Sequence, residues 1–191
     1  MDNRLLEAAQ EGNFEGIRAL LKSGAGIEDR DSVGWTPLMW AASMGFADIV
    51  KLLLESGADP NLRDVYGASA LMKACRRGFN DVVWEMLDHG ADPHAQDDYG
   101  LNSLMRAARA GHADIVRSLV SVSVSLEAAD QYGATALIMG AYRGHTDVVK
   151  ELLQAGANPN ARDRNGWTAM VWALSRHHNA VIEILKKYTK K

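Results

Sequence analysis

An aspartate recurs every 33 residues along this chain, at Asp31, Asp64, Asp97, Asp130 and Asp163. Each aspartate opens the same pattern: Asp-x-x-Gly, then a residue that can cap a helix, then Leu or Met, then a pair of small residues. A fixed period of this length is typical of a stack of one supersecondary unit, in which each unit contacts only its neighbours. Such a stack offers an extended surface rather than a catalytic pocket.

The recurring positions within each repeat have separate physical reasons. A glycine three residues after the aspartate suits a hairpin turn that needs a positive φ, and it occurs as Gly34, Gly67, Gly100, Gly133 and Gly166. A good helix N-cap follows two residues later, as Thr36, Ser69, Asn102, Thr135 and Thr168. Pro37 suits the first helical position. Gly57, Gly90 and Gly156 are expected to end the second helix of their repeats.

The repeat from Asp31 to Asn61 reads DSVGWTPLMWAASMGFADIVKLLLESGADPN. It resembles the ankyrin repeat, whose pattern is D-x-x-G-x-T-P-L-H-x-A-A-x-x-G-H-x-x-I-V-x-x-L-L-x-x-G-A-x-x-N. The resemblance covers nearly the whole chain and implies an all-α repeat solenoid, a stack of helix-turn-helix units joined by β-hairpin-like loops. We therefore expect one ankyrin-repeat domain over residues 1–191. Its expected parts are an N-terminal capping repeat 1–30, full repeats 31–63, 64–96, 97–129 and 130–162, and a C-terminal capping repeat 163–191.

The chain departs from this pattern in three places. The histidine of TPLH is replaced by an apolar row, which we interpret as core filling rather than as a soft binding surface: Leu6, Met39, Met72, Met105, Ile138 and Val171. Ser123 stands where a helix-ending glycine belongs, so either a residue with a side chain takes a positive φ or the turn differs. His177 replaces the glycine between the last two helices, and we expect the final repeat to close differently.

Composition limits the class of protein. The chain has 191 residues, a formal net charge of −3 and 47% apolar residues, which favours one soluble domain with an elongated core. Its one cysteine, Cys75, excludes an internal disulfide and is interpreted as a buried structural thiol rather than a nucleophile. Residues 1–7 lack the apolar core of a signal peptide, and no apolar run is long enough to cross a bilayer. We expect a cytoplasmic monomer without membrane association, or a nuclear one in a eukaryote.

Nothing in the sequence predicts chemistry. Of the six histidines, His112 and His145 occupy a position where the ankyrin pattern itself has histidine, and the others have neither metal-ligand spacing nor a nearby third ligand. The glycines recur with the repeat instead of forming a phosphate-binding loop. Aspartate is common at the hairpins because it bonds to nearby backbone in turns. We expect no enzyme, no catalytic residue, no metal and no cofactor.

The resemblance implies a concave groove, formed by the hairpins and the first helices, where partners bind. In the variable rows of the first helices, the second and later repeats hold seven basic residues and no acidic one. Tyrosines recur at the third hairpin position, with a tryptophan near each end. Trp84, on a second helix, is either an exposed anchor or packs near Tyr66. The expected partner-binding residues are Trp35, Trp40, Tyr66, Lys73, Arg76, Arg77, Tyr99, Leu101, Arg106, Arg109, Tyr132, Met139, Tyr142, Arg143, Trp167, Trp172 and Arg176.

Two classes of function fit these rows. In the first, the chain is a protein-interaction module, an adaptor, inhibitor or assembly factor whose arginines pair with an acidic partner and whose aromatic side chains fill pockets. In the second, the groove holds an anionic non-protein ligand such as an oligonucleotide or nucleotide, with tyrosines stacking on bases. The net negative charge argues against broad affinity for nucleic acid, so the first class is favoured.

Overall fold

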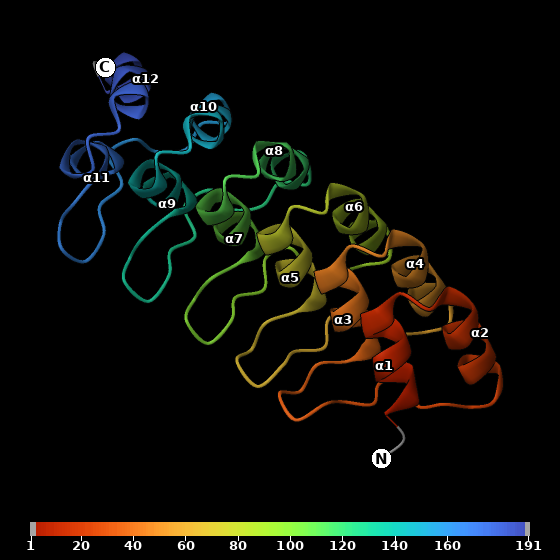
Figure 1. Cartoon of the computed structure of the whole chain (residues 1–191). Coiled ribbons are helices and arrows are strands. Elements are labelled where there is room, and N and C mark those ends of the chain that lie inside the picture. Colours follow the sequence, from red (N-terminus) through yellow and green to blue (C-terminus); the bar gives the residue numbers. More distant parts are fainter. Residues whose placement is uncertain (1–2, 190–191) are drawn as a thin grey trace. The chain divides into compact units, whose positions relative to one another are not determined.

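The computed structural model describes residues 3–189, over which the backbone forms twelve helices and, apart from isolated bridges, no strand (Figure 1). Contacts divide the chain into two compact units, Met1–Pro93 (unit 1) and His94–Lys191 (unit 2). Residues 1–2 and 190–191 lie outside the described residues. The expectation about the absence of a signal peptide begins at the first of these, and the predicted C-terminal capping repeat ends at the last. The prediction of a single domain over the whole chain stays a prediction.

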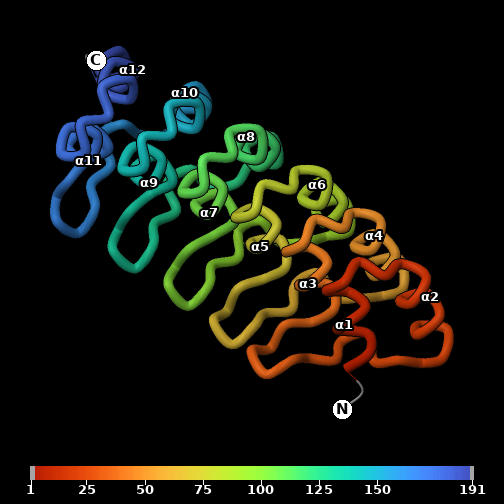
Figure 2. The backbone as a smooth tube through the Cα atoms, in the orientation of Figure 1, coloured from red at the N-terminus to blue at the C-terminus, as the bar shows by residue number. Residues whose placement is uncertain are grey.

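Each unit holds three helix pairs. The helices of unit 1 are α1 (Arg4–Glu11), α2 (Phe14–Lys22), α3 (Pro37–Met44), α4 (Ala47–Glu55), α5 (Ala70–Arg77) and α6 (Asn80–Asp88). Those of unit 2 are α7 (Ser103–Ala110), α8 (Ala113–Ser121), α9 (Ala136–Arg143), α10 (Thr146–Gln154), α11 (Ala169–Ser175) and α12 (Asn179–Tyr188). A long loop precedes the first helix of each later pair, and within each unit these loops project to the same side of the stack (Figure 2).

Side-chain caps start the first helix of each full repeat and of the C-terminal capping repeat, as predicted. Asn102 Oδ1 accepts the N–H of Met105 at 2.9 Å, and Thr36 Oγ1 accepts that of Met39 at 3.3 Å. Ser69, Thr135 and Thr168 make the equivalent bond to the residue three positions later. Because a cap satisfies a backbone donor that the helix cannot, each of these short helices has a defined start.

The predicted helix-ending positions have left-handed backbone, including two that are not glycine. Ser123 has φ 61°, so the first of the two alternatives for this residue is confirmed. His177 has φ 57°, in the same region as Gly144 at the equivalent position with φ 76°. The expectation that the final repeat closes differently is therefore wrong for its backbone conformation. The final repeat does differ at α11, which ends at Ser175, one residue earlier than its counterparts.

The apolar row that replaces the family histidine fills the core of each unit, with one exception. Met39 and Met72 in unit 1 and Met105 and Ile138 in unit 2 are buried, as is Leu6. The interpretation as core filling is confirmed for these residues and is wrong for Val171, which is exposed on α11. Cys75 is fully buried, as predicted.

The first helices of unit 2 pack closely because small side chains separate them. α9 contacts α7 on one side and α11 on the other, and α10 covers it from behind. Gly140 on α9 has no room for a larger residue without adjustment, since a Cβ there would lie 3.0 Å from Val148 Cγ1 on α10. This packing holds α7, α9 and α11 side by side, so that residues at the same register in successive repeats form rows across unit 2.

Candidate functional site

The hairpins that carry the tyrosine row are built around the recurring aspartates. In each repeat, one carboxylate oxygen of the aspartate accepts the backbone N–H groups two and four residues later; for Asp130 these belong to Tyr132 and Ala134, each at 2.9 Å. The same pair of bonds occurs at Asp31, Asp64, Asp97 and Asp163. A carboxylate that accepts two backbone N–H groups fixes the turn and so fixes where the tyrosine beside it points.

Backbone bonds between neighbouring hairpins of unit 2 add a second constraint. The Tyr99 carbonyl accepts the N–H of Gln131 at 2.9 Å, and the Tyr132 carbonyl accepts that of Arg164 at 2.9 Å. The two tyrosine side chains remain 48% and 65% exposed. Exposed aromatic rings on a fixed backbone suit the role of interface anchors, because little conformational entropy of the hairpin is lost on binding.

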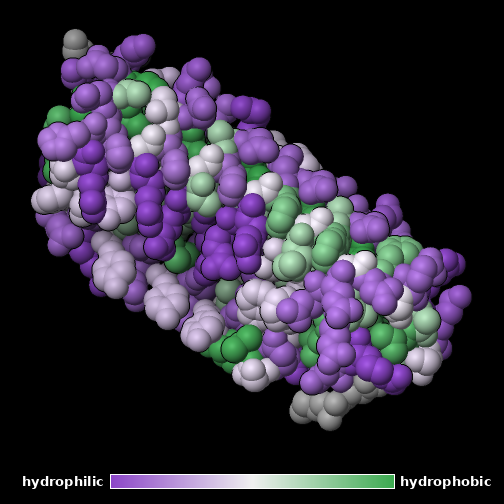
Figure 3. Space-filling view, in the orientation of Figure 1, coloured by the Kyte–Doolittle hydropathy of each residue, from purple (hydrophilic) through white to green (hydrophobic). Residues whose placement is uncertain are grey.

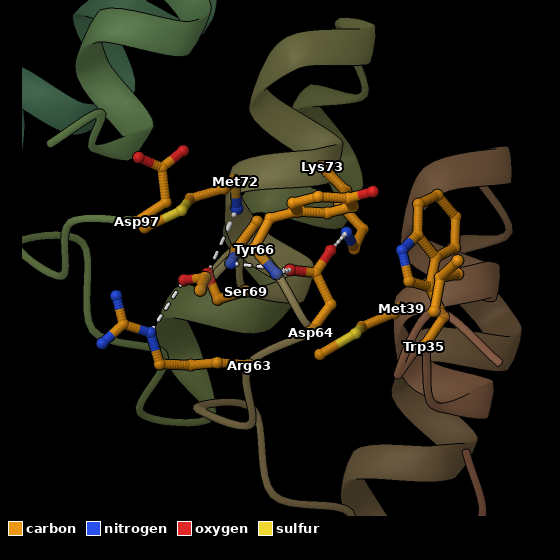
Figure 4. A network of polar contacts seen from close by, with 12 residues as sticks. Trp35, Met39, Arg63, Asp64, Tyr66, Ser69, Met72, Lys73 and Asp97 are labelled. Atoms are coloured by element: carbon orange, nitrogen blue, oxygen red, sulfur yellow. Dashed lines mark hydrogen bonds and ion pairs between the residues drawn. The ribbon is translucent and has the colours of Figure 1, made fainter. Parts of the chain in front are cut away.

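The second carboxylate oxygen of four aspartates accepts a donor from the residue nine positions later, on the first helix of the same repeat. Lys73 Nζ lies 2.5 Å from Asp64 Oδ2, and Figure 4 shows the two side chains pointing toward each other. The indole N–H of Trp40 donates to Asp31 at 3.0 Å, and that of Trp172 donates to Asp163 at 2.8 Å. Arg106 donates to Asp97. The helix rows and the hairpins are therefore connected by side-chain bonds that the sequence analysis did not anticipate.

Two of the seven basic residues in the predicted rows are paired with hairpin aspartates. Lys73 is only 5% exposed, and its ammonium also lies 3.9 Å from the centre of the Trp35 ring. Arg106 is half-buried in its pair with Asp97. The expectation that these two offer free positive charge to a partner is corrected accordingly. Leu101 and Met139 are also buried and contribute little surface.

The pKa of Asp64 reflects this pairing. Burial of the carboxyl by itself raises its pKa, because desolvation disfavours the charged form. The hydrogen bond from Lys73 and those from the backbone N–H groups of Ala68 and Tyr66 outweigh burial, so the pKa of Asp64 lies below the usual aspartate value of 3.8. The carboxylate is therefore ionised at neutral pH and acts as a fixed acceptor.

Two of the other three basic residues in the unit 2 rows, Arg143 and Arg176, lie against an aromatic ring. Arg109, Arg143 and Arg176 are exposed. The Arg176 guanidinium lies 4.4 Å from the centre of the Tyr142 ring and donates to the Tyr142 hydroxyl, and that of Arg143 lies 5.6 Å from the same ring. Figure 3 shows strongly hydrophilic side chains over α9 and α11 on this face. Arginine beside an aromatic face keeps its charge available while its orientation is restricted.

Tryptophans complete this part of the surface. The Trp172 ring meets the Tyr142 ring edge-on with centres 5.0 Å apart, and it meets the Trp167 ring at 4.6 Å. We name as the unit 2 surface the exposed and half-buried side chains of Arg109, Tyr132, Tyr142, Arg143, Trp167, Trp172 and Arg176.

A pocket of about 380 Å³ lies within this surface. Its lining includes the predicted residues Arg109, Tyr132, Met139, Tyr142, Arg143 and Trp172. It also includes residues that the sequence analysis missed, namely Asp130, Ala134, Ile138, Asp163 and Asn165. The sequence analysis assigned the hairpin aspartates to turns alone. A donor stands nine residues after four of the five recurring aspartates, and Met139 stands there after Asp130; this pattern is the signal that could have found the pocket.

In unit 1 the predicted residues form a smaller aromatic group. The Trp35 and Trp40 rings are tilted against each other with centres 4.5 Å apart, and both are half-buried. Tyr66 is exposed on its hairpin, and Arg76 and Arg77 are exposed at the end of α5. Trp84 is partly exposed on α6, away from these rows in the chain.

Within residues 3–189, no group of three or more histidine, cysteine, aspartate or glutamate side chains is placed to hold a metal ion. In that same range no helix is both long enough and apolar enough to cross a membrane. His145 and His178 have another role, since each ring bonds to a backbone carbonyl of the preceding repeat, that of Arg109 and of Tyr142 respectively.

Comparison with known proteins identifies the family. The family model described as ankyrin repeats (3 copies) matches residues 3–64, 57–129 and 104–191, so the chain belongs to the ankyrin repeat family. A solved crystal structure of an ankyrin repeat domain from Acinetobacter baumannii AYE is similar with a TM-score of 0.88 and 31% sequence identity, over 98% of each chain. Ankyrin repeats generally mediate protein–protein interaction, and the fold is typically a non-enzymatic module.

Two curated relatives match a shorter stretch. Protein phosphatase 1 regulatory subunit 27 from Homo sapiens and from Mus musculus are each 50% identical over 42 residues, which is 22% of this chain. The match spans 27% of the length of those proteins. Their similarity therefore concerns little more than one repeat of the stack.

Proposed function

We propose that this protein is a non-enzymatic interaction module whose unit 2 surface binds a protein partner that is acidic at the contact. The observation that carries the proposal is the placement of two exposed arginines, Arg143 and Arg176, against the Tyr142 ring, which itself contacts Trp172. A third exposed arginine, Arg109, lines the same pocket as Tyr142 and Trp172. Guanidinium groups pair with carboxylates through two parallel hydrogen bonds, which gives both affinity and orientation.

The aromatic residues supply the apolar part of the contact. Tyr132 and Tyr99 project from hairpins that are fixed by aspartate and backbone bonds, and both rings are largely exposed. Trp167 is exposed beside Trp172. Tyrosine, tryptophan and arginine are the residues most enriched among those that dominate binding energy at protein interfaces.

The distribution of charge favours a protein over a long nucleic acid. The chain as a whole carries a formal net charge of −3, so a polyanion that extends beyond the basic rows meets repulsion. A protein with a local acidic patch meets only the arginines. The unit 1 residues Trp35, Trp40, Tyr66, Arg76 and Arg77 are proposed as further contacts on the same reasoning.

Affinity capture from a lysate of the source cell tests the proposal. The wild-type chain is compared with Arg109→Glu/Arg143→Glu/Tyr132→Ala, three exposed positions of the unit 2 surface. The control is Lys51→Glu/Lys150→Glu, which makes the same change of charge at exposed positions on the second helices α4 and α10. All samples are treated with nuclease in one arm and left untreated in the other.

The proposal expects a protein that the wild type and the control retain and the triple variant loses, with or without nuclease. Equal retention by the triple variant would show that the unit 2 surface is not the binding site. Capture of nucleic acid by the wild type, with no protein left after nuclease, would favour the anionic non-protein ligand instead.

A further inference from the structure

Asp130 is the exception among the five hairpin aspartates. One of its carboxylate oxygens accepts the N–H groups of Tyr132 and Ala134, as in every repeat. The position nine residues later, which supplies a donor to the other oxygen in the remaining four repeats, is Met139. Methionine has no hydrogen to donate. Within residues 3–189, the second oxygen of Asp130 is thus left without the internal partner that its counterparts have.

The space that the missing donor leaves is open to the surface. Asp130 is half-buried, as is Asp31, and it lines the 380 Å³ pocket of unit 2, whereas Asp64, Asp97 and Asp163 are buried beneath their donors. Ala134, Ile138 and Met139 form the apolar part of the lining. A pocket of this size lies at the lower end of the range of about 300–1,000 Å³ that small ligands occupy, so it is large enough for one long side chain.

The other repeats show which groups this register accepts. The carboxylate oxygen equivalent to that of Asp130 receives a guanidinium from Arg106, an ammonium from Lys73 and an indole N–H from Trp40 and Trp172. At Lys73 the cation also lies against an aromatic ring. In the Asp130 pocket the position equivalent to Trp35 is Leu101, and the aromatic side chains of the lining are Tyr132, Tyr142 and Trp172. A planar guanidinium suits such a site best, because it is weakly hydrated and stacks on aromatic rings.

The two arginines of the pocket lining determine which residues must flank an arginine of the partner that enters the pocket. Arg109 and Arg143 are exposed and repel a lone positive charge. They attract carboxylates, and an arginine flanked by acidic residues satisfies all three groups: its guanidinium reaches Asp130 while its neighbours pair with Arg109 and Arg143. The charges in the lining, two carboxylates and two guanidiniums, match this mixed pattern and not a uniformly acidic one.

We propose that the Asp130 pocket is a subsite for one arginine side chain of the protein partner, set among acidic residues of that partner, so that the partner supplies the donor that Met139 does not. This inference rests on the proposed function of the unit 2 surface and narrows the class of partner sequence that it recognises.

The test uses two synthetic peptides, acetyl-Glu-Glu-Arg-Glu-Glu-amide and the same peptide with citrulline in place of arginine. Citrulline has nearly the shape of arginine but no charge. Binding to the full chain is followed by NMR at the methyl group of Met139 and by titration calorimetry. The protein variants are Asp130→Asn, which keeps an oxygen to accept the turn N–H groups, and Met139→Arg, which places an internal donor at the register of Arg106.

The wild type is expected to bind the arginine peptide about tenfold more tightly than the citrulline peptide, the scale of one charge-assisted hydrogen bond in a partly buried site. Both variants are expected to reduce this ratio to about one. Equal affinity of the wild type for both peptides, or absence of binding at millimolar peptide, overturns the inference. Persistence of the tenfold ratio in Asp130→Asn or Met139→Arg overturns it as well.

Failure of the proposed function gives a different result. With Arg109→Glu/Arg143→Glu, the account expects weaker binding of both peptides, because the flanking glutamates lose their partners. If both peptides bind this variant as tightly as the wild type and the arginine peptide keeps its advantage, the acidic contact is wrong while the arginine subsite stands. If this variant binds both peptides more weakly than the wild type does, and the wild type binds the two peptides equally, the acidic contact is supported and the arginine subsite is wrong.

Discussion

Lys73 and Asp64 form an almost fully buried ion pair within unit 1, with Nζ 2.5 Å from Oδ2 and side chains that are 6% and 3% exposed. The pair joins the first helix of a repeat to its own hairpin. A residue that the sequence places in a row of surface cations is thus bonded inside the scaffold instead, as Arg106 is to Asp97 in unit 2.

Removal of one member of this pair should be costly. Lys73→Met leaves the buried Asp64 carboxylate without its counterion, and we expect a loss of about 3 kcal/mol in the free energy of unfolding. Urea denaturation followed by circular dichroism measures it. Met139 shows that methionine is accommodated at this register, so the loss reports the charge and not the packing. Asp64→Asn/Lys73→Met should recover much of the loss; a double variant as unstable as the single one would contradict this explanation.

The same pair predicts how stability depends on pH. The folded pKa of Asp64 is lowered below 3.8, so its contribution is fully present above the unfolded pKa and is lost as the pH falls through the folded value. We expect stability to fall with acidification below pH of about 4 in the wild type. The fall should be shallower in Asp64→Asn/Lys73→Met. Thermal unfolding measured from pH of about 2 to about 6, the range over which aspartate titrates, checks this. Identical slopes would show that Asp64 does not contribute.

Replacement of Ser123 by glycine should relieve backbone strain and raise the stability of the protein. Its φ of 61° is in the left-handed region, which costs a residue with a side chain free energy that glycine does not lose. Ser123→Gly is expected to raise the free energy of unfolding by about 0.5–1 kcal/mol. The matched reverse change is Gly90→Ser at the equivalent turn of unit 1, where φ is 81° and a Cβ would meet no atom within 4 Å. Opposite signs for the two variants are expected, and equal signs would contradict the account.

Two glycines separate backbone strain from steric conflict. Gly45 and Gly57 both have a positive φ, of 84° and 95°. A Cβ at Gly57 would meet nothing within 4 Å, whereas one at Gly45 would lie 2.7 Å from the Phe79 ring. Gly57→Ala should therefore cost about 1 kcal/mol from backbone strain, and Gly45→Ala should cost more because Phe79 must move. Thermal unfolding of both variants checks the order; a smaller loss at Gly45 would contradict the observed packing.

Much of the fold could be predicted from the sequence because the 33-residue period repeats each local signal five times. The caps such as Thr36 and the left-handed glycines such as Gly34 depend only on neighbours in the chain, and the structure has them where they were expected. Val171 differs because α11, within residues 3–189, contacts α9 and α12 but no later first helix, which leaves this side chain exposed. Burial at this position depends on packing by a neighbouring repeat and cannot be read from the residue itself.

The candidate site was harder to predict because it depends on pairs of positions. The rows of Arg109, Tyr142 and Arg143 follow from the period alone. The capture of Lys73 by Asp64, and the opening beside Asp130, require knowing that residues nine apart meet across the hairpin and the helix. Turn chemistry explains one oxygen of each aspartate and gives no information about the other. A pocket that results from one missing donor has no sequence motif of its own.

The most direct test of the central claim is the affinity of the captured partner, once purified, for three chains: the wild type, Arg109→Glu/Arg143→Glu and the control Lys51→Glu/Lys150→Glu. Measured by titration calorimetry at low and high salt, the wild type and the control should bind alike, with affinity that falls as salt rises. The Arg109→Glu/Arg143→Glu chain should bind at least about tenfold more weakly. Equal affinity of all three chains, without dependence on salt, would contradict an acidic partner held by the arginines of unit 2.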